Sequence, residues 1–387
     1  MLKFIGRRLI QMVFLFFLFL TLVFFLLQAQ PGDITSQFID PTIPAEVRAQ
    51  IAERLGLGGS IWTQWWNYIT NFVTGNLGVS FQQYPRTVID VIAERIPRTL
   101  FLFSFATVLA YVIGFSLGKR LAWRRGGFSE HSVTIGGVLL YTVFYPWFAI
   151  IMILTFASGF GWFPINGFLT PSFWRNAPFT GNEVFGQMIL SIVVATVIGL
   201  ATKWFASRQD ERSAARLVRW IGYSTALGLF ALFWLTKPEM RPFAMDILHH
   251  SVLPIVTLAL IAFAGTMLLT RGAMLETLKE DYILTAQAKG VPEKDIRDKH
   301  AARNALLPVV TSLVLGLAFI IGGGVVTETV FSWPGMGSLL LTATIAEDVP
   351  VATGALAFIG ILALIAHLVV DILYAVLDPR IRIQDAN

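Results

Sequence analysis

Long apolar segments separated by polar ones dominate the hydrophobic pattern of this chain. A helix needs about 20 apolar residues to cross the hydrocarbon core of a bilayer. Eight segments approach that length, at residues 9–28, 99–118, 132–156, 186–205, 217–236, 250–270, 308–330 and 351–376. The pattern therefore predicts an all-α integral membrane protein with about eight transmembrane helices.

Composition supports this fold class and narrows the chemistry. Of the 387 residues, 55% are hydrophobic and only 14% are charged. There is no cysteine, which excludes disulfides, thiolate nucleophiles and Cys-ligated metals. The first apolar run, 9–27, is longer than the core of a usual signal peptide, and LLQAQPGD offers no clear cleavage site. We expect an uncleaved first span.

The basic residues predict the orientation, because Lys and Arg concentrate in cytoplasmic loops. Segment 119–125 carries four basic residues and no acid, and 203–219 carries five basic residues. Together with the basic N-terminus, they place both termini and segment 271–308 on the cytoplasmic side. The small net charge of +5 follows from such loops and gives no reason to expect nucleic acid.

The segment from Gln30 to Arg98 then lies outside and is too long for a simple connector. PAEVRAQIAERLGL has the spacing of an amphipathic helix, and WTQWWNYITNFVTGNLG repeats aromatic residues at helical spacing before a glycine-rich stop. We predict a small external helical region on the membrane surface. Two interpretations stay open for it, a packed lid or a binding surface.

Segment 271–308 differs from every other connection in the chain. It carries seven Lys or Arg residues and six Asp or Glu residues, so it is a mixed-charge surface. Apolar residues follow one helical face as far as Ala286, Gly290 ends that helix, and Pro292 starts another. The small Ala286, Ala288 and Gly290 would allow the backbone of a soluble partner to approach closely. We therefore predict a docking element for such a partner.

Two features inside the predicted spans are candidates for a transport path. Gly322, Gly323 and Gly324 are consecutive, and each weakens a helix by about 1 kcal/mol relative to alanine. Such a run is tolerated beside a water-filled path or where helices pack closely, and both interpretations stay open. Glu328 follows near the outer end of the same span. These four residues form a tentative translocation pathway.

Enzymatic chemistry is not predicted. The chain has no GxxxxGK[ST], HExxH or GxSxG motif. His249 and His250 are adjacent at the mouth of a span, where an interface position is a better explanation than a metal site. His367 and Asp371 share a face of the last span, and we expect Asp371 to pair with an Arg at a neighbouring helix end. No catalytic residue and no metal site are therefore assigned.

The mixed-charge segment resembles the EAA motif of ABC importer permeases of the dipeptide/oligopeptide family (the DppB/OppB type). The similar residues run from Thr285 to Gly290 and from Arg303 to Pro308, while Leu284 stands where the general motif has Glu. PGDI, AERLGL, GNLGVS, RIPRTL, ETVFSWPGMG and LVVDILYAVLDPRIR also resemble the family. The resemblance covers most of the chain.

The resemblance implies a fold and a set of residues. Family members usually have six spans, so an inserted transmembrane hairpin at 186–236 would be added to a six-span core. The remaining regions would be 1–98 with the first span and the external helical region, 99–185 with two spans and an external loop, and 237–387 with the rest of the core and a coupling loop at 271–308. The ATPase-coupling residues would be Tyr282, Thr285, Ala286, Ala288, Lys289 and Gly290.

The resemblance also implies partners. The chain would form half of a pathway for di- or oligopeptides in the plasma (inner) membrane of a prokaryote. A second permease of the DppC/OppC type, two ATP-binding subunits, an extracytoplasmic solute-binding protein and the lipid bilayer would be its partners. ATP and Mg would be used by the ATP-binding subunits, and this chain would bind no cofactor. Oligosaccharides or nickel are alternative substrates of similar permeases, and an intramembrane enzyme is the alternative outside transport.

Overall fold

The structure is a computed structural model that describes residues 2–28, 60–124, 126–209, 211–320 and 324–377. These residues are helical apart from turns and one isolated bridge between Val79 and Thr87. The prediction of an all-α protein is confirmed. The chain divides into two compact units, the first formed by 1–150 and 255–387 and the second by 151–254. The boundaries fall inside two helices, and the second unit contains the hairpin predicted at 186–236.

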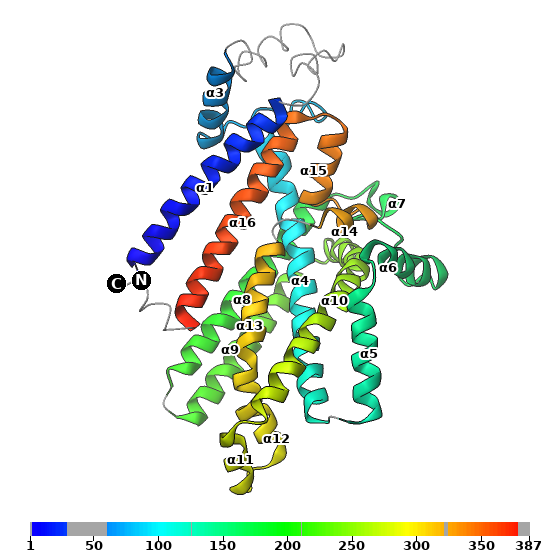
Figure 1. The fold of residues 1–387 in the computed structure, drawn as a ribbon. Coiled ribbons are helices and arrows are strands. Elements are labelled where there is room, and N and C mark those ends of the chain that lie inside the picture. The colour runs from blue at the N-terminus through cyan, green and yellow to red at the C-terminus, as the bar shows by residue number, and fades with distance from the viewer. Residues whose placement is uncertain (1, 29–59, 125, 210, 321–323, 378–387) are drawn as a thin grey trace. The chain divides into compact units, whose positions relative to one another are not determined.

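The first unit contains most of the long helices (Figure 1). They are α1 (Leu2–Gln28), α3 (Ile61–Val73), α4 (Val88–Trp123), α5 (Phe128–Thr142), most of α6 (Tyr145–Met152), α10 (Arg241–Thr277) from Ile255 onward, α11 (Asp281–Ala288), α12 (Glu293–Asp295), the π-helix η3 (Ile296–Ala301), α13 (Ala302–Ile320), α14 (Val325–Val330), α15 (Met336–Ile345) and α16 (Val349–Leu377). α4 packs with α13, α15 and α16, and α1 packs with α16. α4 is thus the helix around which this unit is built.

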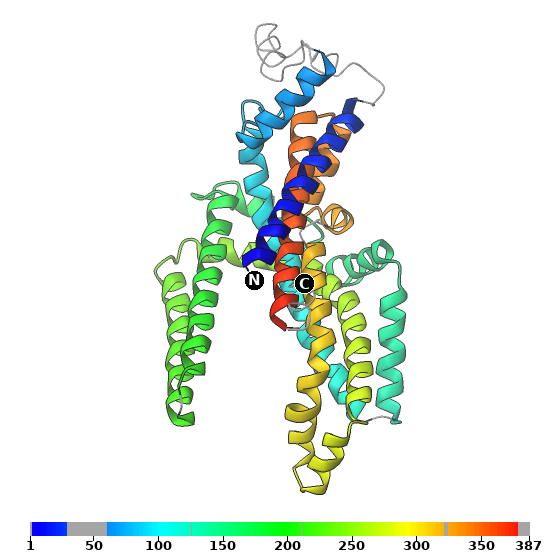
Figure 2. The ribbon, with the colours of Figure 1, turned by 60° about the vertical axis from the view of Figure 1, so that its left-hand side comes forward.

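The second unit consists of the π-helix η2 (Ile153–Gly159), α7 (Pro171–Trp174), α8 (Gly181–Ser207), α9 (Arg212–Leu235) and the first residues of α10. α8 and α9 form an antiparallel hairpin (Figure 2). Thr180 and Glu183 form a capping box at the start of α8. Both residues use side-chain oxygens to satisfy backbone N–H groups that a helix start leaves without partners.

Small residues lie where the two hairpin helices pack against each other. Ser191 is buried and accepts a hydrogen bond from Trp234 Nε1 at 3.3 Å. Gly222 lies directly against Thr202, and Ala226 is also buried. A Cβ added at Gly199 would meet nothing within 4 Å, so Thr202 and not Gly199 makes the contact with Gly222.

Five helices are long and apolar enough to cross a membrane, and a sixth span results if α5 and α6 count together. The predicted single span at 132–156 is wrong in shape, since this pair bends by 109°. Pro146 explains the bend: it has no N–H for the carbonyl four residues earlier, and its ring clashes with that carbonyl. The remaining predicted spans, 308–330 and 351–376, lie on α13–α14 and α16, which do not meet the same test within the described residues.

The external region is described only from residue 60 onward. Ser60 caps α3, whose Trp65 and Tyr68 pack on α1 together with Ile69 and Phe72. The predicted aromatic helix is therefore confirmed, and its stop falls at two glycines with positive φ, Gly75 and Gly78. The amphipathic helix predicted from PAEVRAQIAERLGL lies outside the described residues.

Candidate functional site: the coupling loop and the outer turn

The predicted coupling loop, residues 271–308, forms a helical projection that we call the knob. It continues from α10 and leads into α13 (Figure 2). Gly290 separates α11 from α12 and has a φ of +69°. Glycine adopts this left-handed conformation without the steric cost that other residues incur. Pro292 follows as the N-cap of α12. The predicted arrangement, two helical arms around a glycine turn, is what the structure shows.

The knob has a hydrophobic core of its own. Met274, Ile283, Ala286 and Ile296 are buried there, together with Ala122 of α4. Ala286 is only 8% exposed, so its side chain faces the interior of the knob. The expectation that Ala286 presents a small surface to a partner is therefore corrected. Its side chain packs in the core of the knob instead.

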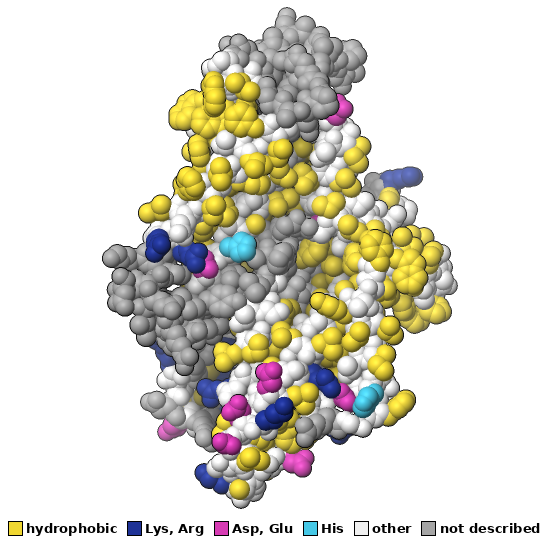
Figure 3. Space-filling view, viewed as in Figure 1, with side chains coloured by type: hydrophobic (Ala, Val, Ile, Leu, Met, Phe, Trp, Pro, Cys, Tyr) yellow, Lys and Arg dark blue, Asp and Glu magenta, His cyan; other side chains and the backbone are white. Residues whose placement is uncertain are grey.

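The outer surface of the knob is formed by the other predicted coupling residues. Thr285, Ala288, Lys289 and Gly290 are exposed. Tyr282 is 37% exposed, and its hydroxyl accepts a hydrogen bond from Asn304 Nδ2 at 2.8 Å. Charged side chains of both signs gather over α11 and α12 (Figure 3). This mixture of small, apolar and charged groups suits contact with a protein surface.

Leu284 is the residue of the knob that sequence reasoning undervalued. The sequence marks it only as a departure from the Glu of the general motif, yet its side chain is 57% exposed. The signal was present in the sequence, because Leu284 falls off the apolar face that Ile283 and Ala286 define. It adds an apolar group to the exposed surface.

Two ion pairs join the knob to the helix ends on either side of the connection between α4 and α5. Lys119 Nζ lies 3.0 Å from Asp298 Oδ1, and Arg271 Nη2 lies 2.6 Å from Glu130 Oε1. Arg297 also donates to both oxygens of Asp298, at 3.0 and 2.9 Å. The hydrogen bonds from Arg297, aided by Lys119, hold the pKa of Asp298 well below its usual range. Asp298 is therefore ionised at neutral pH.

At the other end of α4, Glu328 organises a turn that we call the outer turn (residues 331–338). Glu328 is fully buried, accepts a hydrogen bond from Thr99 Oγ1 at 2.7 Å and another from Ser338 N at 2.9 Å. Thr99 Oγ1 in turn accepts from Met336 N at 2.7 Å. A Cβ at Gly335 would overlap the carboxyl group of Glu328. The motif ETVFSWPGMG thus encodes a buried carboxylate and a turn whose glycine leaves room for it.

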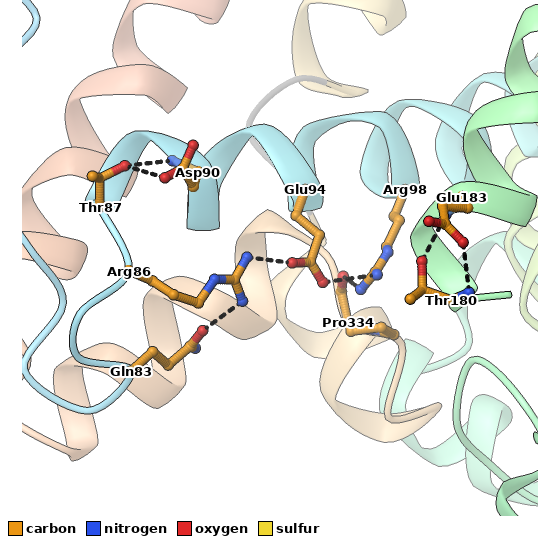
Figure 4. Close-up of polar contacts among 9 residues, drawn as sticks. All are labelled: Gln83, Arg86, Thr87, Asp90, Glu94, Arg98, Thr180, Glu183 and Pro334. Atoms are coloured by element: carbon orange, nitrogen blue, oxygen red, sulfur yellow. Dashed lines mark hydrogen bonds and ion pairs between the residues drawn. The ribbon is translucent and has the colours of Figure 1, made fainter. Parts of the chain in front are cut away.

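Trp333 and a chain of charged groups complete the attachment of the outer turn. Trp333 is fully buried and donates from Nε1 to the carbonyl of Arg98 at 3.2 Å. Glu94 Oε1 and Oε2 pair with Arg98 and Arg86 at 2.9 and 2.6 Å (Figure 4). Arg98 also donates to the carbonyl of Pro334 at 3.4 Å. Sequence reasoning missed the attachment of Trp333 and Pro334 to Arg98 because these contacts join positions more than 200 residues apart.

The structure gives different outcomes for the four residues predicted to line the translocation pathway. Gly322 and Gly323 lie outside the described residues. Gly324 precedes α14 and lies directly against Phe103 of α4, which favours the close-packing interpretation. Glu328 is 0% exposed and bonded to α4 and to the outer turn. This placement supports a structural role for Glu328 and gives no support to its prediction as a pathway residue.

The histidine candidates make backbone contacts. His249 Nε2 and His250 Nδ1 each lie 2.8 Å from a carbonyl oxygen, of Trp162 and Asp246 respectively. Among the described residues, no group of three His, Asp or Glu side chains could hold a metal ion. Asp371 lies 3.3 Å from Arg8 Nε, so the predicted pairing with an Arg at a neighbouring helix end is confirmed.

Comparison with known proteins shows where the chain belongs. Residues 217–383 match the family model described as the binding-protein-dependent transport system inner membrane component, and residues 1–103 match the model of its N-terminal part. An oligopeptide transport system permease protein, AppB, of Bacillus subtilis is 30% identical over 93% of both chains.

Two further relatives extend over almost the full length. The di/tripeptide transport system permease protein DppB of Pseudomonas aeruginosa is 31% identical over 99% of this chain and 100% of its own. The dipeptide transport system permease protein DppB of Escherichia coli is 30% identical over 99% of both chains. With the helical membrane fold and the exposed knob, these matches lead to one conclusion: the chain belongs to the family of inner-membrane permease components of binding-protein-dependent transport systems.

Proposed function

We propose that the chain is one of two permease subunits of an ATP-driven importer for di- or oligopeptides. A second permease would complete the pathway, two ATP-hydrolysing subunits would bind on the cytoplasmic side, and a solute-binding protein would deliver substrate outside. Family membership and the names of the relatives support this assignment. Both termini and the knob would lie in the cytoplasm, as the distribution of Lys and Arg predicts.

The exposed tip of the knob is the observation that carries the proposal. Ile283 and Ala286 anchor the tip internally, while Thr285, Ala288 and Lys289 face outward. A rigid helical element with small exposed residues can enter a groove on another protein, because binding then costs little ordering of the element. The chain has no phosphate-binding loop of its own, so ATP and Mg would act in the partner subunits.

The relatives favour peptides over the other substrates. The names of the relatives above refer to dipeptides, di- and tripeptides or oligopeptides. A further relative from Escherichia coli, 29% identical over 99% of this chain, is named as a glutathione transport system permease protein. We therefore infer a short peptide as substrate in preference to an oligosaccharide or nickel. Uptake of a radiolabelled dipeptide by vesicles that contain the assembled transporter tests this point directly.

The docking assignment is tested by Ala288→Arg with Ala288→Ser as its matched control. The arginine places bulk and charge on the exposed face without entering the core of the knob. We expect Ala288→Arg to insert normally but to lose co-purification with the ATP-hydrolysing subunits, and Ala288→Ser to keep it. Gly290→Arg should act in the same way, whereas Gly290→Asn, which tolerates the left-handed conformation, should retain assembly. Wild-type assembly of Ala288→Arg would contradict the assignment.

A further inference from the structure

The connection between α4 and α5 is attached to the knob at two separated points. One point is the pair Arg271–Glu130, at the end of α10 where the coupling loop begins. The other is the pair Lys119–Asp298, in η3 beyond the glycine turn. The first pair links α10 to the start of α5, and Glu130 also accepts a hydrogen bond from Gly126 N in the connection between α4 and α5. The second pair links η3 to the end of α4. Figures 1 and 2 show this connection at the same end of the first unit as α11 and α12.

Glu130 is built into its position. Its carboxylate is 5% exposed, receives Arg271 at 2.6 Å and accepts a hydrogen bond from Gly126 N at 3.3 Å. His131 Nδ1 lies 3.4 Å from the same carboxylate. A carboxylate with so little contact with water is retained where it has partners, since a buried charge without them is costly. Glu130 thus joins the turn between α4 and α5 to α10.

The second attachment is more exposed. The side chains of Lys119 and Asp298 are 23% and 27% exposed, and Arg297 holds the carboxylate in a bidentate contact. Ala122 of α4 packs in the core of the knob beside Ile283 and Ile296. The ion pair therefore adds a charged link between η3 and α4 beside this packed interface.

Close backbone contact prevents α4 and α10 from sliding past one another at this end. A Cβ at Gly114 would lie 2.7 Å from the carbonyl oxygen of Phe263, and one at Gly118 would lie 2.6 Å from that of Met267. Packing this tight leaves little room for independent motion of the helices. A displacement of the knob must then either move α4 and α5 or break the two ion pairs.

We propose that Glu130 and Asp298 are positioning residues that make the α4–α5 connection part of the coupling unit, so that movement of the knob is passed to α4 and α5. The proposal rests on the proposed function, in which the knob binds an ATP-hydrolysing subunit. The physical basis is a continuous set of contacts between the tip and α4, with two charged links outside the packed core. None of the four residues in these two links is among those that carry the resemblance to the importer family.

The test uses a fluorophore on the connection in the assembled transporter. Phe128 is 89% exposed, and Phe128→Cys gives the chain its single thiol for labelling. We expect a non-hydrolysable ATP analogue to change the fluorescence of the labelled wild-type background. Glu130→Gln combined with Asp298→Asn should reduce that change roughly five-fold or more, the lower end of ordinary coupling between sites. Glu130→Asp and Asp298→Glu keep the charges and should retain it.

Asp295→Asn is the matched control. Asp295 pairs with Lys299 within the same arm of the knob, at 2.7 Å, and makes no link to α4. It should leave the fluorescence change intact. An unchanged response in the double variant, an equal loss in Asp295→Asn, or failure of only the double variant to assemble would each overturn the proposal. Failure of the unmutated chain to bind its ATP-hydrolysing subunits would instead overturn the proposed function.

Discussion

The two ends of α4 are held by different kinds of contact. We call Val88–Thr99 the outer end and Phe115–Trp123 the inner end, after the orientation predicted from Lys and Arg. At the outer end, Trp333 and Glu328 are fully buried, and Thr99 donates a hydrogen bond to Glu328 and accepts one from Met336 N of the outer turn. At the inner end, Ala122 packs in the core of the knob, and Lys119, whose side chain is 23% exposed, forms an ion pair with Asp298. The nearby pair between Arg271 of α10 and Glu130 of α5 has a cationic side chain that is 29% exposed.

The difference concerns how easily each attachment can change. Removing one partner from a buried hydrogen-bonded network leaves the other partner unsatisfied, at a cost of about 1–3 kcal/mol. Partly exposed ion pairs contribute less, and salt weakens them. The outer end of α4 is therefore suited to a constant geometry, while the charged links at the inner end can change with little loss. In a permease this would let α4 respond to the knob without dismantling the outer turn.

Loss of the outer turn should have the largest effect. Trp333→Ala removes a fully buried indole and its hydrogen bond to Arg98, and we expect a loss of about 3–5 kcal/mol in unfolding free energy. Thermal unfolding of the purified transporter measures it. Trp62→Ala removes the same side chain where it is 66% exposed and should cost far less. Equal destabilisation by the two variants would show that burial does not distinguish the outer end.

Local features of the fold could be predicted because their signals are local. Gly290 and Pro292 predict the turn of the knob within a few residues, and the spacing of Ile283 and Ala286 could have shown that Ala286 faces inward. The bend between α5 and α6 was missed although Pro146 gives the signal for it. A hydropathy pattern records how apolar a segment is and does not record where its backbone hydrogen bonds are interrupted.

Contacts between distant segments could not be predicted from one sequence. Thr99 and Glu328 are separated by 229 positions, and no local pattern marks either as a partner of the other. The same holds for Lys119 and Asp298. Asp371 was different, since its depth in a span made a cationic partner at a helix end a physical expectation, and Arg8 is that partner. Burial cost can predict that a charge needs a partner, while identifying the partner requires the fold.

Asp298→Asn should have an intermediate effect that depends on salt. The pKa of Asp298 is lowered in the folded state, so its contribution is present above the unfolded value of about 3.9 and is lost as pH falls through the folded pKa. We therefore expect the contribution of Asp298 to stability to be constant between pH 6 and pH 8. This contribution should be at most about 1 kcal/mol, because solvent screens the ion pair. Hydrogen exchange of the amides of η3 measures it.

Salt separates the ion pair from the packed core of the knob. Raising the salt concentration to about 1 M shortens the Debye length to about 3 Å and should bring wild-type exchange rates towards those of Asp298→Asn. The core of Ile283, Ala286 and Ile296 should keep its protection throughout. A difference between the two proteins that is insensitive to salt would mean that Asp298 acts through packing, and the inner end would then resemble the outer end.

Arg86→Gln should lower the unfolding free energy the least of these variants. It tests whether burial or position along α4 determines how strongly a contact stabilises the fold. Arg86 belongs to the outer end, yet its side chain is 44% exposed, and Glu94 keeps Arg98 as a partner when Arg86 is removed. Gln83, which accepts a hydrogen bond from Arg86, can turn to water. We expect a loss of about 0.2–1 kcal/mol by thermal unfolding, no larger than that of Asp298→Asn. A loss comparable to that of Trp333→Ala would mean that every contact of the outer end, exposed or buried, belongs to one cooperative network, and burial would no longer explain the contrast between the two ends.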